Sequence, residues 1–405
     1  MKHGPLPTLL FLSLTLVIPS CSLVIVNIDF IDDPGIASTI LDQSGDAFAQ
    51  IDPIELNDEI HNFIDSHVDR NLSTAAKVGK IRELMFDPQF LDIQYSTDRT
   101  YTAMEVFENK SGNCLSVMNF FIGVIRYLEL DANFQTVKVK PIWDSRGGLN
   151  VLYEHINAIG SIRGGQQYVM DFTPEIALLD YTAREISDEQ ARALYFSNLG
   201  AELMINGDLE QALPYLKNAL WIDPDLSLAW NNIGVIYSRL GQAELAEYSY
   251  KKGYSINRSN ATVISNLANL YGAVGDFEKA DYYQAAVRQF QNRNPYYHYN
   301  LGNDAFRANQ FQVAERHYLR AIRRHDKEPE FFLVLANTYQ QMGDNAQARR
   351  MLDRAQLLAE SDPVSARTAS DNLRLVDRNS LRAVGAQPTI TISDGTNNDI
   401  LNVFN

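Results

Sequence analysis

The chain has 405 residues, of which 45% are hydrophobic and 21% are charged. This length exceeds one typical hydrophobic core, so two or three folded domains are expected. The formal net charge of −15 and the lack of a basic cluster exclude a nucleic-acid backbone as the main partner. The sequence carries no phosphate-binding loop or dinucleotide fingerprint, and it has no closely spaced pair of metal ligands. It therefore predicts neither a cofactor nor a metal site.

Residues 1–21 have the features of an export signal. Lys2 and His3 give a weakly positive start, and the run Leu9 to Ile18 is apolar over a signal-peptide length. The run closes with Ile18-Pro19-Ser20-Cys21, which resembles the lipobox of bacterial lipoproteins. The resemblance implies lipidation of Cys21 and a place in the bacterial cell envelope. Because serine rather than aspartate follows the cysteine, it implies an outer-membrane anchor that faces the periplasm.

An uncleaved anchor is the alternative for the same segment. Apolar residues resume after Cys21, so Leu9 to Ile28 can be one interrupted span of about bilayer length. The acidic residues that follow would leave the body of the protein outside the cytoplasm. Both alternatives thus predict an extracytoplasmic protein held at a membrane. Residues 22–50 end in a stretch rich in aspartate, glycine and serine, which predicts a linker.

The stretch Ser111-Gly112-Asn113-Cys114 introduces an apolar run that reaches Leu128, and this predicts a buried helix with Cys114 in its first turn. Gly112 supplies the turn and Asn113 the cap. The unpaired N–H groups at a helix start favour a thiolate, which is the nucleophilic form of cysteine. If Cys21 is lipidated, the only other cysteine has no partner, although exported proteins normally pair their cysteines. The alternative is that Cys114 is a small buried core residue.

Beyond residue 128 the hydrophobic pattern changes from helical periodicity to alternation. Phe134 to Val139 predicts a strand, and residues 152–162 and 167–172 predict two antiparallel strands around Gly164-Gly165. His155 and Asp171 lie on the two arms of this hairpin, so they can meet on one face if the register is right. Helices followed by antiparallel strands predict an α+β domain over residues 51–186.

Three motifs in this region occur in the order found in the transglutaminase-like (papain-related) superfamily, and the chain resembles that superfamily there. They are Ser111-Gly112-Asn113-Cys114, Glu154-His155-Ile156-Asn157 and Tyr168-Val169-Met170-Asp171-Phe172-Thr173-Pro174. The resemblance implies that Cys114 is the nucleophile, that His155 is the base and that Asp171 orients the histidine. It also implies an oxyanion hole that includes the Cys114 N–H group. Asn157 stands where the family commonly has an aromatic residue, which leaves the substrate contacts open.

Residues 193–362 repeat with a period of 34 residues. Small residues, alanines and turn residues each recur at this interval, at Gly200, Gly234, Ala268, Gly302 and Ala336, at Ala212, Ala246, Ala280, Ala314 and Ala348, and at Gly207, Gly241, Gly275, Asn309 and Gly343. This pattern resembles five tetratricopeptide repeats, which start near residues 193, 227, 261, 295 and 329. Each repeat is predicted to be a helical hairpin, and the stack to form an all-α right-handed superhelix with a concave face.

Asparagines recur at two positions of the first helix of the repeats, at Asn198, Asn232, Asn266 and Asn300, and three residues further on at Asn269, Asn303 and Asn337. In the tetratricopeptide family both positions face the concave side. Asparagine can pair with the donors and acceptors of an extended peptide backbone. These residues are therefore predicted to form an exposed peptide-binding groove. Replacing Asn232 and Asn266 by alanine is expected to weaken partner capture and to change stability by no more than about 0.5 kcal/mol each. The alternative is that polar residues only solvate the groove.

Residues 363–382 are predicted to form a capping helix, and residues 383–405 a disordered tail. Taken together, the patterns predict a membrane-anchored, extracytoplasmic enzyme that transfers or hydrolyses acyl groups through a thioester, by amide or peptide hydrolysis or by transamidation. The repeats would recruit a protein or peptide. The alternative is a non-catalytic envelope scaffold that binds proteins through its repeats, and an assembly factor for envelope complexes is a third possibility.

Overall fold

The structure is a computed structural model that describes residues 28–42, 45–96, 99–146, 149–162, 165–172, 178–258, 260–293, 295–361, 373–377 and 400–404. The predicted export signal and its Cys21 lie outside these ranges. None of the helices within them is long and apolar enough to cross a membrane.

Four helices build the helical half of the α+β domain: α2 (Asp58–His67), α3 (Thr74–Phe86), α4 (Ala103–Asn109) and α5 (Cys114–Tyr127). Helix α5 is the central one, because nearly all of its side chains are buried. The short strand β2 (Ser111–Gly112) lies immediately before it and pairs in parallel with β1 (Gln94–Tyr95), which precedes α4. Burial on every side is expected for a helix whose sequence is apolar all round.

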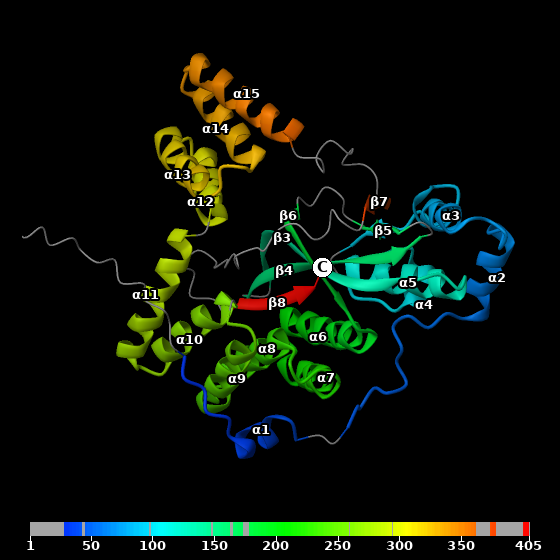
Figure 1. The fold of residues 1–405 in the computed structure, drawn as a ribbon. Coiled ribbons are helices and arrows are strands. Elements are labelled where there is room, and N and C mark those ends of the chain that lie inside the picture. The colour runs from blue at the N-terminus through cyan, green and yellow to red at the C-terminus, as the bar shows by residue number, and fades with distance from the viewer. Residues whose placement is uncertain are drawn as a thin grey trace, which may run out of the picture.

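The sheet of this domain has the strand order β6 (Leu178–Ile186), β3 (Asn133–Arg146), β4 (Leu149–Ser161), β5 (Gln166–Met170) and β7 (Leu373–Asp377), with all neighbours antiparallel. An additional strand, β8 (Ile400–Phe404), pairs with β4 in parallel (Figure 1). The same edge of β4 thus carries β5 at residues 158–161 and β8 at residues 150–154. This arrangement agrees with the predicted α+β class.

A change of register between β3 and β4 lies next to the predicted catalytic histidine. Val137 pairs with His155, whereas Ile142 pairs with Tyr153, so four residues of β3 stand opposite one residue of β4. Such bulges bend and twist a sheet and redirect side chains, and they are frequent beside active sites.

Five helical hairpins follow the sheet, as the 34-residue period predicts (Figure 1). They consist of α6 (Asp188–Asn206) and α7 (Leu209–Ile222), α8 (Ser227–Arg239) and α9 (Ala243–Ile256), α10 (Ala261–Ala273) and α11 (Phe277–Arg293), α12 (Pro295–Arg307) and α13 (Phe311–Arg324), and α14 (Pro329–Gln341) and α15 (Asn345–Ser361). The turn residues have φ between 57° and 90°. The small residues allow close helix contact, since a Cβ atom on Gly302 would lie 2.4 Å from the Tyr318 ring.

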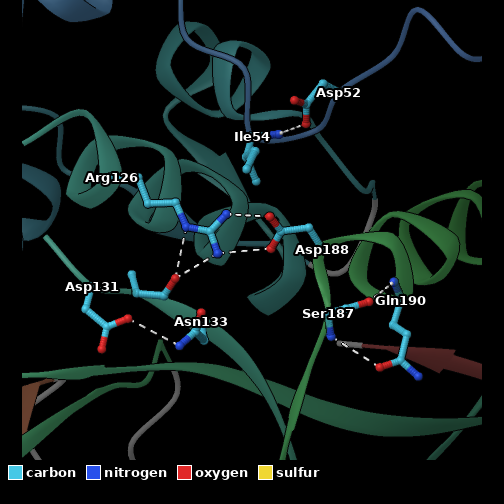
Figure 2. A network of polar contacts seen from close by, with 9 residues as sticks. Asp52, Ile54, Arg126, Asp131, Asn133, Ser187, Asp188 and Gln190 are labelled. Carbon is cyan, nitrogen blue, oxygen red and sulfur yellow. Dashed lines mark hydrogen bonds and ion pairs between the residues drawn. The ribbon is translucent and has the colours of Figure 1, made fainter. Parts of the chain in front are cut away.

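The first three hairpins and the α+β domain share one hydrophobic core, whereas the last two hairpins have small cores of their own. A polar network reinforces this junction on the surface (Figure 2). Arg126, near the end of α5, donates to both carboxylate oxygens of Asp188 at 2.6 and 3.0 Å and to the Ala132 carbonyl. Asp188 is the first residue of α6, so the network ties the end of the cysteine helix to the start of the repeats.

The region predicted to be a linker is folded against the repeats over its described part, so this prediction is wrong. It contains helix α1 (Pro34–Ile40), capped by Asp33. The Ala47 N–H group donates to the Asn218 side chain at 2.9 Å, and Phe48 stacks on Phe196 and Tyr215. Its aromatic residues pack on the first two hairpins, since Phe30 also contacts Tyr248, and local composition does not reveal this packing.

The prediction for the C-terminal region is also wrong. Residues 373–377, expected in a capping helix, form strand β7, and residues 400–404, expected to be disordered, form strand β8. Both strands pair with sheet edges that β5 and β4 would otherwise leave open. An unpaired edge offers a row of backbone hydrogen-bonding groups, and this can order a short segment whose own sequence gives only a weak signal.

Candidate active site

Cys114 is the first residue of α5, and its helix start is held by hydrogen bonds from three directions. The Asn113 side chain accepts from the Ser116 N–H group at 2.9 Å and donates to the Thr100 hydroxyl at 2.8 Å. The Ser116 hydroxyl in turn accepts from the Tyr101 N–H group at 2.7 Å. Gly112 is required sterically, since a Cβ atom there would lie 2.7 Å from the Ser116 Cβ atom. The predicted cap at Asn113 is thus present, whereas Gly112, expected in a turn, is the last residue of strand β2. These contacts give Cys114 a fixed position.

His155 and Asp171 meet at the open part of the β4 edge. The Nε2 atom of His155 lies 3.0 Å from both carboxylate oxygens of Asp171. Ala158 of β4 pairs with Met170 of β5, so the next residue, Asp171, lies opposite Asn157. His155 is two residues from Asn157 on the same strand and is therefore the diagonal neighbour of Asp171. The Asn157 amide donates to Asp171 at 3.3 Å and so helps to hold the carboxylate. Both members of the pair are 1% exposed.

The thiol of Cys114 completes this group. Burial alone would lower the pKa of His155, but the Asp171 carboxylate and the Cys114 thiolate stabilise the imidazolium and raise the pKa to about 10. The Nε2 atom of His155 is hydrogen-bonded to Asp171. The other ring nitrogen, Nδ1, is buried and has no hydrogen bond of standard geometry within the described residues. Nδ1 is therefore the atom available to exchange a proton with the thiol.

The structure brings all three sequence-predicted residues together from separate elements: the start of α5, the middle of β4 and the end of β5. Cys114 is fully buried, which agrees both with a nucleophile and with a core residue. The two interpretations are distinguished by the residues beside the thiol. An inert core thiol needs no histidine–carboxylate pair beside it. The described residues contain no cluster of side chains able to hold a metal ion.

Two further features of the site were not recognised in the sequence. Asn157, which appeared only as a departure from the family pattern, supports Asp171; its place two residues after His155 puts it on the same strand face. Thr100 connects the cysteine helix to the repeats, because its hydroxyl accepts from both Asn113 and Asn198. Its N–H group donates to Glu202 on α6 at 2.6 Å. The contacts of Thr100 with Asn198 and Glu202 join residues about a hundred positions apart, so no local pattern gives them.

Glu202 gives a testable pH dependence. Burial raises its pKa to about 7, against the lowering effect of the Thr100 hydrogen bond. A carboxyl whose pKa is raised in the folded state holds its proton there, so its contribution to stability decreases as pH rises from about 4.5 through 7. Glu202→Gln keeps an acceptor for Thr100 without the charge. We expect the variant to gain stability over the parent chain at pH 8 but not at pH 4.5, as measured by melting temperature. An equal difference at both pH values would contradict the assignment.

The predicted asparagine groove is only partly as expected. Asn198, Asn232 and Asn266 are 0% exposed, so the expectation that these positions are solvent-exposed is wrong. Asn266 donates to Asn231 at 2.9 Å, and Asn231 donates to Asn232 at 3.3 Å. The later positions differ: Asn300 and Asn337 are exposed, and Asn269 and Asn303 are half-buried. Loss of a buried amide hydrogen bond costs about 1–3 kcal/mol, well above the small effect predicted from the sequence.

Comparison with known proteins identifies the repeats. Residues 228–260 and 329–362 match a family model described as "Tetratricopeptide repeat", and residues 299–337 match a second model with that description. No curated protein matches the chain. The C-terminal part of the chain is therefore a tetratricopeptide-repeat array, which supports an interaction with proteins or peptides.

Solved structures similar to the chain cover less than half of it. MamA protein is 17% identical over 43% of this chain and 94% of its own, with a TM-score of 0.24. YrrB, titled a TPR protein with an unusual peptide-binding site, is 17% identical over 43% of this chain and 90% of its own, with a TM-score of 0.24. PilF of Pseudomonas aeruginosa is 21% identical over 44% and 89%, with a TM-score of 0.25.

Proposed function

We propose that the protein is a membrane-anchored, extracytoplasmic thiol enzyme of transglutaminase-like type, and that its repeats recruit a protein or peptide substrate. The arrangement of His155 between Asp171 and Cys114 is the observation that supports this proposal. The lipobox-like motif at Cys21 supports the anchor and the location in the bacterial cell envelope.

The reaction proceeds by acyl transfer through a thioester. In the resting site the thiol proton is already held by the His155 imidazolium, so the Cys114 sulfur attacks the carbonyl carbon of an amide as a thiolate. The imidazolium gives this proton to the leaving nitrogen as the carbon–nitrogen bond breaks, and the acyl group stays on sulfur. Water or an amine then attacks the thioester and loses a proton to the neutral His155, which releases an acid or a new amide and restores the thiolate–imidazolium pair. Asp171 orients the ring and stabilises its cationic form throughout.

The choice between water and an amine can be tested directly. Folded protein is incubated with casein and dansylcadaverine, with dye incorporation into casein and ammonia release measured in parallel. Dye incorporation indicates transamidation, and ammonia or new amino termini without dye indicate hydrolysis. Cys114→Ser should abolish either signal, whereas Asn345→Ala, at an exposed position of α15 outside the predicted groove, should leave it unchanged. A signal that persists in Cys114→Ser contradicts the proposal.

A non-catalytic scaffold is the second candidate, and the matched repeats favour it. In that case the thiol would be a structural residue, and partner binding would carry the whole function. The two candidates differ in one observable property, because only the enzyme requires the reactivity of Cys114 to depend on His155.

A further inference from the structure

Strand β8 (Ile400–Phe404) lies between the sheet and the repeats (Figure 1). On one side it extends the edge of β4 in parallel, with Asn150 to Glu154 paired to Ile400 to Phe404. On the other side it contacts α6, α8 and α10, the first helices of the first three hairpins. We call this place, formed by β4 residues 150–154 and these three helices, the β8 site.

The repeat side of the β8 site carries the buried asparagines. Asn198, Asn232 and Asn266 lie one on each of the three helices that contact β8, and each is 0% exposed. Side-chain amides at this position supply donors and acceptors that suit a peptide backbone. The β4 edge offers its own N–H and C=O groups, as in other cases of strand addition. The β8 site is therefore equipped to recognise the main chain of an extended segment.

The direction of β8 links it to the chemistry. Because β8 runs parallel to β4 and Phe404 pairs with Glu154, the strand advances towards His155, the next residue of β4. Asp171 and Met170 continue the same edge on the far side, since Met170 pairs with Ala158. A peptide bound like β8 therefore enters the site with its carbonyl end first. This is the end that an acyl-transfer enzyme must present to its nucleophile.

We infer that the β8 site is the binding site for the acyl-donating side of an extended peptide, and that residues 400–404 of the chain occupy it as an internal competitor. The role of the bound peptide as acyl donor rests on the proposed function. Binding of the peptide at the β8 site does not require a reactive thiol. Because both the β4 edge and the asparagines would bind the main chain, the inference predicts broad sequence tolerance at this site.

Peptide binding to full-length protein with a weakened β8 tests the inference. Leu401→Pro combined with Asn402→Pro removes two adjacent N–H groups, one of which points towards β4 in any strand register. The probe is a fluorescein-labelled synthetic peptide with the sequence of residues 400–404, followed by fluorescence anisotropy. We expect the proline variant to bind it at least about tenfold more tightly than the parent chain, because an internal occupant lowers the apparent affinity. Adding Asn266→Ala should weaken binding about tenfold, and adding Asn345→Ala, at an exposed asparagine outside the predicted groove, should not.

A second measurement uses the unmodified chain, so the inference stays testable if the proline variant does not fold. Excess unlabelled peptide should speed hydrogen exchange at residues 400–404, because these residues leave the site when the peptide enters. Equal affinity of the parent chain and a folded proline variant, or unchanged exchange, would overturn the inference. Adding Cys114→Ser should leave peptide binding intact. A chain that binds the peptide but shows no thiol reactivity would therefore refute the proposed enzyme and not this binding site.

Discussion

Replacing His155 by alanine should slow alkylation of Cys114 at pH 7 by about thirtyfold, because an ordinary thiol with a pKa of about 8.5 is only about 3% ionised at that pH. The imidazolium that stabilises the thiolate is lost in this variant. Since Asp171 and Cys114 raise the pKa of His155 to about 10, the ring stays charged in the parent chain at neutral pH. The advantage of the parent chain should be largest near neutral pH and should shrink above about pH 8.5, where an ordinary thiol ionises without a partner. Iodoacetamide labelling, followed by mass spectrometry at several pH values, measures both effects.

The controls separate the role of the histidine from general damage. Asp171→Asn should give a smaller loss, because it removes the carboxylate that holds the ring but keeps the ring itself. His298→Ala, at a buried histidine on α12, should leave the rate unchanged. Because Cys114 is fully buried, the series is repeated with Leu401→Pro and Asn402→Pro present, where access to the thiol is expected to be faster. Equal rates and pH profiles for the parent chain and His155→Ala would refute the assignment of His155.

Thr100→Val should destabilise the protein by about 3 kcal/mol and should also reduce the reactivity of Cys114. The substitution keeps the shape of the side chain but removes the hydroxyl that accepts from Asn113 and Asn198, and both of these amides are buried. Each lost partner leaves a donor without its hydrogen bond, and Asn113 caps the helix that begins at Cys114. Urea unfolding and iodoacetamide kinetics at low urea give the two readouts.

Thr338→Val is the matched control for this substitution. Thr338 is also buried, but its hydroxyl donates only within its own helix, to the Val334 carbonyl. It should cost about 1 kcal/mol and leave Cys114 unaffected. If Thr100→Val has the stability of the parent chain, the threonine does not couple the repeats to the cysteine helix.

The sequence predicts those parts of the molecule in which local pattern and structure coincide. The 34-residue period places every hairpin, since small residues and turn residues have steric requirements that the backbone imposes within a few positions. The cap at Asn113 and the hairpin that carries His155 are also local. The meeting of His155 with Asp171 follows from the hairpin register, and their place beside Cys114 was expected from the family resemblance.

Features that depend on distant contacts could not be predicted in this way. The burial of Asn232 and Asn266 depends on the packing of neighbouring repeats, where Asn266 donates to Asn231 of the preceding repeat. The roles of β7 and β8 depend on open sheet edges, and the packing of Phe48 depends on a surface formed by two later helices. In each case the local sequence allows several structures, and the tertiary environment selects one.

The nucleophilic role of Cys114 is tested most directly by locating the adduct that an electrophile leaves on the folded chain. Full-length protein is treated with iodoacetamide at pH 7, its fold is verified by circular dichroism, and the modified residue is identified by peptide mass spectrometry. We expect one adduct, on Cys114, that forms before unfolding and is strongly reduced in His155→Ala. A thiol that stays unmodified in the parent chain and in the folded proline variant, and that reacts only after denaturation, would contradict a catalytic role for Cys114.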